Sequence, residues 1–287
     1  MKKRISVVVV ALLFVLFSTY AQTTDFLELV KTGTPQIVQD AINSGANMKA
    51  RDSMGRGPLL VAASNNPDPK VITILLKAGE DVHGLDREGN SCLVWATRNN
   101  IEVITALLKA GADVETREPL YDATALMWAA SNNPDPKVIT ALLQYGADVK
   151  SRNRDNVTPL MWAAMKNKNA EVILTLLKAG AEFNAQDSGG RTALMWAAHS
   201  NSNPKVIETL LDAGSNIKAL DFMGRTPLML AAEANPNPEV IIALLKAGAD
   251  AKPKDEAGKT AIDYAKSNYS LRVRGADAFR MLQEASQ

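Results

Sequence analysis

The chain of 287 residues is long enough for one large domain, two ordinary domains or an extended array of repeats. Apolar residues make up 46% and charged residues 22%, as in packed proteins, and a formal net charge of +1 gives no general argument for nucleic acid or an anionic membrane as the partner. The single cysteine, Cys92, excludes a disulfide within the chain, so packing alone must stabilise the fold.

Residues 1–21 have the pattern of a bacterial export signal. The basic residues Lys2–Arg4 precede an unbroken apolar run at residues 5–17, and Ala21 follows at a plausible cleavage point. As a helix, this run spans about 20 Å, which is short of the ~30 Å hydrocarbon core of a bilayer. We therefore expect a cleaved signal peptide and a mature protein in the periplasm or outside the cell, with no membrane association after cleavage. The alternative is a form tethered to the membrane by an uncleaved signal.

An apolar segment recurs along the rest of the chain at intervals of 33 or 34 residues. Clear copies are the Leu-Met-Trp-Ala-Ala segments at residues 126–130, 160–164 and 194–198. A second block with two apolar pairs recurs in phase and ends before a glycine, as at residues 138–146 and 240–248. The spacing of the apolar residues predicts two short helices in each repeat, and a period of this length is typical of solenoid proteins.

Residues at the ends of the predicted helices support the same alignment. Thr158, Thr192 and Thr226 precede Pro or Ala at the start of a first helix, where threonine can cap the exposed amides. The glycine after each second helix supplies the left-handed residue that ends it. The turn between repeats has a position that requires positive φ, and we expect this conformation at Gly55, Gly89, Asp122, Asn156, Gly190, Gly224 and Gly258.

The combination of Asp-x-x-Gly-x-Thr-Pro-Leu, Ala-Ala and Leu-Leu-x-x-Gly-Ala-Asp is similar to the ankyrin repeat, from about residue 25 to the C-terminus. The resemblance implies an all-α solenoid of stacked helix-turn-helix pairs, joined by β-turn fingers, that binds other proteins. In place of the family's usual histidine after Thr-Pro-Leu the chain has methionine, so the hydrogen bonds of that histidine must be absent or replaced. These methionines are Met127, Met161, Met195 and Met229.

The alignment also predicts the limits of the parts. A capping half-repeat at residues 22–50 follows the signal peptide, and a capping repeat at residues 254–287 ends the chain, where Phe279, Met281 and Leu282 can close the last layer. Six repeats fill residues 51–253, at 51–84, 85–117, 118–151, 152–185, 186–219 and 220–253.

Several residue types could carry chemistry. The four tryptophans Trp95, Trp128, Trp162 and Trp196 share one repeat position, and we interpret them as a hydrophobic spine rather than a ladder for ligands. Equivalent methionines are expected about 10 Å apart, too far to share a metal ion. Cys92 stands at a helix start, where a buried small residue is expected rather than a nucleophile. We predict no catalytic residue, no metal and no cofactor.

The turn tips and the positions after the Ala-Ala pair are expected to line one concave groove. Large apolar residues on exposed turns are typical of interface centres, although tips that pack on one another remain an alternative. The candidate partner-binding residues are Met54, Arg87, Leu120, Tyr121, Arg154, Phe222 and Met223 at the tips and Arg98, Met165, Lys166 and His199 after the Ala-Ala pair. A basic row after the turn glycine is interpreted as solvated rather than as an acid-binding stripe, and comprises Arg56, Arg191, Arg225 and Lys259.

The sequence therefore predicts a monomeric, non-catalytic scaffold that binds a partner protein through this groove and does not bind nucleic acid. Two alternatives stay open. One is a secreted effector that binds host proteins. The other is an enzyme subunit with a site in the groove, for which convergent titratable residues in a real pocket would argue.

Overall fold

The computed structural model describes residues 25–287, apart from the side chains of residues 272–274. The signal peptide predicted at residues 1–21 lies outside the described residues. Two compact units make up the chain: unit 1 ends at Pro119, and unit 2 spans Leu120–Gln287. No helix within residues 25–287 is long and apolar enough to cross a membrane.

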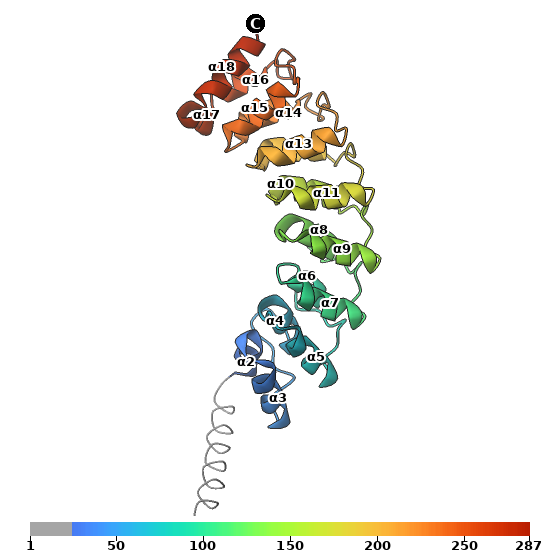
Figure 1. Ribbon diagram of the computed structural model, residues 1–287. Helices are drawn as coiled ribbons and strands as arrows, with labels where there is room; N and C mark the ends of the chain where they lie inside the picture. The colour runs from blue at the N-terminus through green and yellow to red at the C-terminus, as the bar shows by residue number, and fades with distance from the viewer. Residues whose placement is uncertain (1–24) are drawn as a thin grey trace, which may run out of the picture. The chain divides into compact units, whose positions relative to one another are not determined.

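Unit 1 consists of three helical pairs (Figure 1). The first helix of each pair packs on the first helix of the next, and the second helices pack on one another in the same way. The first helices are α2 (Phe26–Thr32), α4 (Pro58–Asn65) and α6 (Cys92–Ala96), and the second helices are α3 (Pro35–Asn43), α5 (Pro69–Lys77) and α7 (Ile101–Lys109).

Unit 2 repeats this arrangement and confirms the predicted all-α stack of helical pairs. Its first helices are α8 (Ala125–Asn132), α10 (Pro159–Lys166), α12 (Ala193–Ser200), α14 (Pro227–Ala234) and α16 (Ala261–Ala265). Its second helices are α9 (Pro136–Gln144), α11 (Ala170–Lys178), α13 (Pro204–Asp212) and α15 (Pro238–Lys246). At the C-terminal end, α17 (Tyr269–Arg274) and α18 (Ala276–Ala285) cover α15, and α18 also packs on α16. Leu282 is buried there and Phe279 and Met281 are half-buried, as expected for residues that close the last layer.

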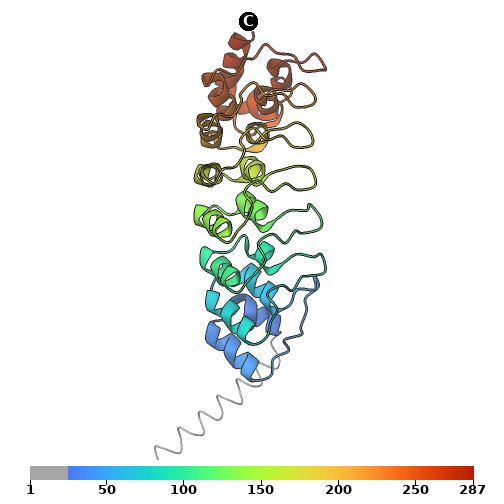
Figure 2. The same ribbon diagram turned by 90° about the vertical axis from the view of Figure 1, so that its right-hand side faces the viewer.

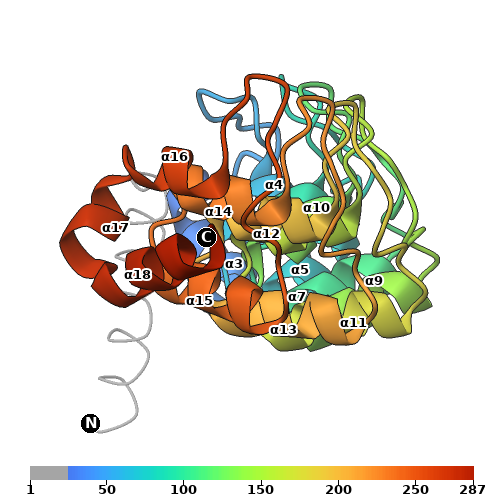
Figure 3. The same ribbon diagram turned by 90° about the horizontal axis from the view of Figure 1, so that it is seen from above.

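The connections between consecutive pairs in unit 2 project as fingers to one side of the helices (Figures 2 and 3). The first helix of each pair lies between the fingers and the second helix, so we call the first helices inner and the second helices outer. The predicted positive φ is confirmed at all seven finger positions, including the two without glycine, Asp122 (58°) and Asn156 (59°). Asp and Asn tolerate this region better than other non-glycine residues.

Threonine caps the inner helices as predicted. The hydroxyl oxygens of Thr158, Thr192 and Thr226 accept hydrogen bonds from the backbone N–H three residues later. In two of these helices, the methionine at that third position accepts a hydrogen bond in place of the family's histidine. Thr158 N–H donates to the sulfur of Met161 at 3.5 Å, and Thr226 N–H donates to that of Met229 at 3.4 Å. Sulfur is a weak acceptor, but it satisfies an amide that would otherwise be buried without a partner.

Buried asparagines tie neighbouring repeats together, a feature absent from the sequence-based predictions. Each asparagine lies at the end of an inner helix or a few residues after it, and its side-chain amide donates to two backbone carbonyls of the preceding pair. Asn201 is the clearest example, with bonds of 2.9 Å to Ala164 O and 2.8 Å to Asn167 O. The same pair of hydrogen bonds recurs at the half-buried Asn99 and at the buried Asn66, Asn167, Asn235 and Asn268.

Candidate partner-binding surface

We define the finger face of unit 2 as the finger tips together with the accessible ends of the inner helices. Hydrogen bonds between consecutive fingers fix the tips. Phe222 N–H donates to Gly189 O at 3.0 Å, and Glu256 N–H donates to Met223 O at 3.1 Å. The tips are residues 120–121, 154–155, 188–189 and 222–223, and the helix ends are residues 165–166, 199–200 and 233–234.

Two apolar patches lie on this face. Leu120 and Tyr121 are 70% and 46% exposed, and Phe222 and Met223 are 67% and 55% exposed. The fingers at residues 154–155 and 188–189 come between the two patches in the chain and carry polar residues or glycine. The finger face thus offers two separate apolar contacts rather than one continuous strip.

The tips also pack on one another. A Cβ atom on Gly190 would lie 2.6 Å from Cδ1 of Phe222, which shows how closely this ring covers the preceding finger. In unit 1, a Cβ atom on Gly55 would collide with Cγ of Arg87, and Arg87 N–H donates to Met54 O at 3.1 Å. Phe222 therefore has one structural contact and still leaves two thirds of its surface accessible.

The remaining predicted site residues lie on polar parts of the surface. Arg154 is exposed on a finger tip, and Lys166 is exposed at the end of α10 beside the half-buried Met165. His199 is half-buried at the same position in α12. In unit 1, Arg98 is exposed just after α6.

The tryptophans, which were predicted to form a hydrophobic spine, are not equally buried. Trp162 is buried, but Trp95, Trp128 and Trp196 are half-buried. Their surroundings explain the difference, because polar groups of the fingers reach two of these rings. The indole N–H of Trp95 donates to Asp86 and that of Trp196 to Asp187, both at 2.9 Å.

Trp128 differs from these two tryptophans and belongs to the Leu120–Tyr121 patch. The position aligned with the finger aspartate is Pro119 in its repeat, and the indole N–H of Trp128 has no partner within residues 25–287. Instead its ring lies edge-on to Trp162, with 5.1 Å between centroids, and Tyr121 lies edge-on to both at 6.1 Å. Such aromatic pairs add about 0.5–1.5 kcal/mol beyond burial, so this patch is a firmly held aromatic cluster.

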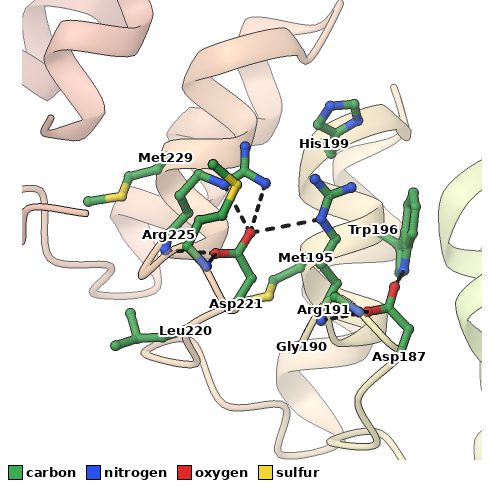
Figure 4. A network of polar contacts seen from close by, with 12 residues as sticks. Asp187, Gly190, Arg191, Met195, Trp196, His199, Leu220, Asp221, Arg225 and Met229 are labelled. Atoms are coloured by element: carbon green, nitrogen blue, oxygen red, sulfur yellow. Dashed lines mark hydrogen bonds and ion pairs between the residues drawn. The ribbon is translucent and has the colours of Figure 1, made fainter. Parts of the chain in front are cut away.

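The basic row that was predicted to be solvated is solvated only in part: Lys259 is exposed and Arg191 is partly exposed, but Arg225 is buried. Arg225 is 7% exposed, and its guanidinium pairs with Asp221 at 2.8 Å (Figure 4). It also pairs with Glu233 at 3.0 Å. In unit 1, Arg56 pairs with Asp52 at 2.8 Å and lies 4.5 Å above the ring of Trp95. Both arginines are therefore paired with carboxylates, Arg225 inside the protein and Arg56 in a half-buried position, which the pattern of basic residues alone did not reveal.

Two side chains that could carry chemistry, His199 in unit 2 and Cys92 in unit 1, have shifted pKa values. Burial, followed by the positive charge of Arg191, lowers the pKa of His199 below its ordinary value. Burial raises the pKa of the Cys92 thiol to about 12, and this thiol donates to Val82 O at 3.1 Å, as expected for a buried structural residue. Within the described part of the chain, no three His, Cys, Asp or Glu side chains gather as metal ligands would.

Two open hollows lie on the outer helices. One is between α5 and α7 and is lined mainly by aliphatic, threonine and lysine side chains. The other is between α11 and α13. Neither is lined by histidine or cysteine.

Stacked helical pairs with a finger at each connection define a helical solenoid protein. The family model for ankyrin repeats, in three copies, matches residues 26–118, 126–221 and 194–284. The chain therefore belongs to the ankyrin-repeat family, whose domains are typically non-catalytic modules that bind proteins. No curated protein shows significant sequence similarity to it.

Proposed function

We propose that the chain is a non-catalytic, monomeric scaffold that a bacterium exports and that holds a partner protein on its finger face, where the groove was predicted. The observation that carries the proposal is the pair of exposed apolar patches at Leu120–Tyr121 and Phe222–Met223. Exposed aromatic and large aliphatic side chains are costly in water unless a partner covers them, and such residues dominate interface energies.

The double variant Leu120→Ser/Phe222→Ser is expected to lose partner capture. The mature chain would be immobilised in an envelope extract of the source bacterium, the retained protein identified, and its Kd then measured with purified proteins. Loss of two hot-spot side chains weakens binding by about 2 kcal/mol or more, which is at least roughly 30-fold. The midpoint of urea unfolding should change little, because both side chains are mostly exposed.

A matched control is available on other surfaces of unit 2. Tyr145 and Tyr269 are 43% and 76% exposed, and neither lies on a finger. The variant Tyr145→Ser/Tyr269→Ser should bind as the wild type does. Unchanged capture by the Leu120→Ser/Phe222→Ser variant would contradict the proposal, and a large loss of stability would show that the patches are part of the core.

Export rests on the basic and apolar pattern of residues 1–21. Alkaline phosphatase needs disulfides that form outside the cytoplasm, so a fusion of residues 1–30 to this reporter should be active in a bacterial host. Deleting residues 5–12 should abolish that activity. Fractionation of the source bacterium then distinguishes a periplasmic protein from a secreted effector that meets host proteins. An active reporter without the apolar run would contradict export by this segment.

A further inference from the structure

Arg191 lies on the finger face of unit 2 with its charge only loosely paired. Its Nε is 3.8 Å from Oδ2 of Asp221, whose side chain is 1% exposed. Nε and Nη2 of Arg225 already hold the Asp221 carboxylate at 2.9 and 2.8 Å, and the backbone N–H groups of Met223 and Arg225 donate to its other oxygen. Arg191 is therefore a second, more distant cation beside a carboxylate that is already satisfied.

The guanidinium of Arg191 is held in place by Trp196. Its Cζ lies 5.0 Å from the centroid of the indole ring, and the indole is itself fixed by the hydrogen bond to Asp187. The Arg191 side chain is 24% exposed. A planar guanidinium that is stacked in advance loses little conformational freedom when it forms further hydrogen bonds, so Arg191 is preorganised for a ligand.

His199 adds a second donor beside this guanidinium, which points toward the imidazole in Figure 4. Nδ1 of His199 shares a hydrogen bond of 2.7 Å with the hydroxyl of Ser200. Within residues 25–287, no hydrogen bond engages the terminal nitrogens of Arg191 or Nε2 of His199. Donors of two side chains thus remain available on one half-buried part of the finger face.

We propose that Arg191 and His199 bind one carboxylate of the partner protein, the side chain of an aspartate or a glutamate. This inference rests on the proposed scaffold function and names the chemistry that the finger face recognises. The guanidinium fork matches the geometry of a carboxylate. A phosphate dianion fits less well, because the site offers one loosely paired cation and the Glu233 carboxylate, bound to Arg225 at 3.0 Å, lies on the neighbouring helix.

The site predicts that binding depends on pH. Around His199, Arg191 and Arg225 lower its pKa and Glu233 raises it, while Lys166 ends the neighbouring inner helix α10. A bound carboxylate favours the protonated imidazole and so raises the pKa of His199. By reciprocity, protonation of His199 strengthens carboxylate binding. The affinity therefore rises as the pH falls through the raised pKa of His199 in the complex, and it stops rising below the pKa of His199 in the free protein.

The test uses hexaglutamate with a blocked N-terminus, followed by NMR of labelled histidine in the full mature chain. The chain has two histidines, and the exposed His83 serves as an internal control. Hexaglutamate should shift the His199 signals saturably, leave His83 unchanged, and bind more tightly at about pH 6 than at about pH 8. Hexaglutamine and hexalysine should produce no such shift. A preference for hexalysine, or no saturable shift of His199 with hexaglutamate, would overturn the inference.

Substitutions of Arg191 supply the second part of the test. Arg191→Gln should weaken hexaglutamate binding roughly tenfold or more and should also raise the pKa of His199 in the free protein, which reports the loss of a nearby charge in a folded chain. Arg191→Lys keeps the charge without the fork and should bind with intermediate affinity. Lys178→Gln removes the same charge from the exposed end of α11 and should leave binding unchanged.

Equal binding by Arg191→Gln and wild type would refute the site. The peptide experiment needs no natural partner, so its failure differs from failure of the scaffold function. Capture that depends on Leu120 and Phe222 without peptide binding would leave the scaffold standing and remove the carboxylate site. Peptide binding without such capture would support the carboxylate site and contradict the proposed scaffold function.

Discussion

Replacing Asn201 with leucine is expected to lower the free energy of unfolding by about 3–5 kcal/mol. Asn201 is 2% exposed at the end of α12, where its amide donates to Ala164 O and Asn167 O and its carbonyl oxygen accepts from Asn203 N–H at 2.9 Å. Leucine has a similar size but leaves two carbonyls and one N–H buried without a partner, and each such group costs about 1–3 kcal/mol.

The midpoint of urea unfolding, followed by circular dichroism, measures this loss, and amide exchange along α12 locates it. The Asn201→Asp variant keeps the shape but turns a carboxylate toward two carbonyl oxygens, so its loss at neutral pH should be at least as large. Asn216→Leu is the control, because Asn216 is exposed and its side chain only accepts from the nearby Lys218 N–H. A nearly neutral Asn201→Leu would show that the carbonyls find other donors.

The backbone of the fold was predictable from the sequence because the signals that define it are local. A threonine cap acts within three residues, and a left-handed turn position depends on one residue type. For this reason all seven finger positions were predicted correctly, including Asp122 and Asn156, where no glycine marks the conformation.

The asparagine bonds between repeats were missed although their signal was in the sequence. Asn167, Asn201 and Asn235 recur at the same interval of 34 residues as Trp128, Trp162 and Trp196. An exposed loop asparagine and a buried one look alike in a single sequence. Only the packing of the preceding helical pair shows which carbonyls need a donor.

Side-chain partners from other elements account for the two corrections. The tryptophan position was predicted to be core, but finger residues such as Asp187 reach the indole and hold it at the surface of the inner helix. Arg225 was predicted to be solvated, but Glu233 on the following helix and Asp221 on its own finger enclose it. Neither arrangement follows from periodicity, because both depend on how far individual side chains extend.

The Arg225→Met variant should lose about 3–5 kcal/mol of stability, because it leaves the Asp221 charge buried without its close cation. Arg191, at 3.8 Å, can move closer and compensate in part, so Arg191→Gln/Arg225→Met should lose more than the two single variants together. Adding Asp221→Asn to Arg225→Met should restore part of the loss, since the uncompensated charge is then removed. Urea unfolding at neutral pH measures the free energy of unfolding of all four variants.

Arg280→Met is the control. The side chains of Arg280 and its partner Asp277 are 67% and 79% exposed, so little change is expected. An Arg225→Met protein as stable as the wild type would show that water reaches Asp221, and the enclosed ion pair would then not support this part of the stack.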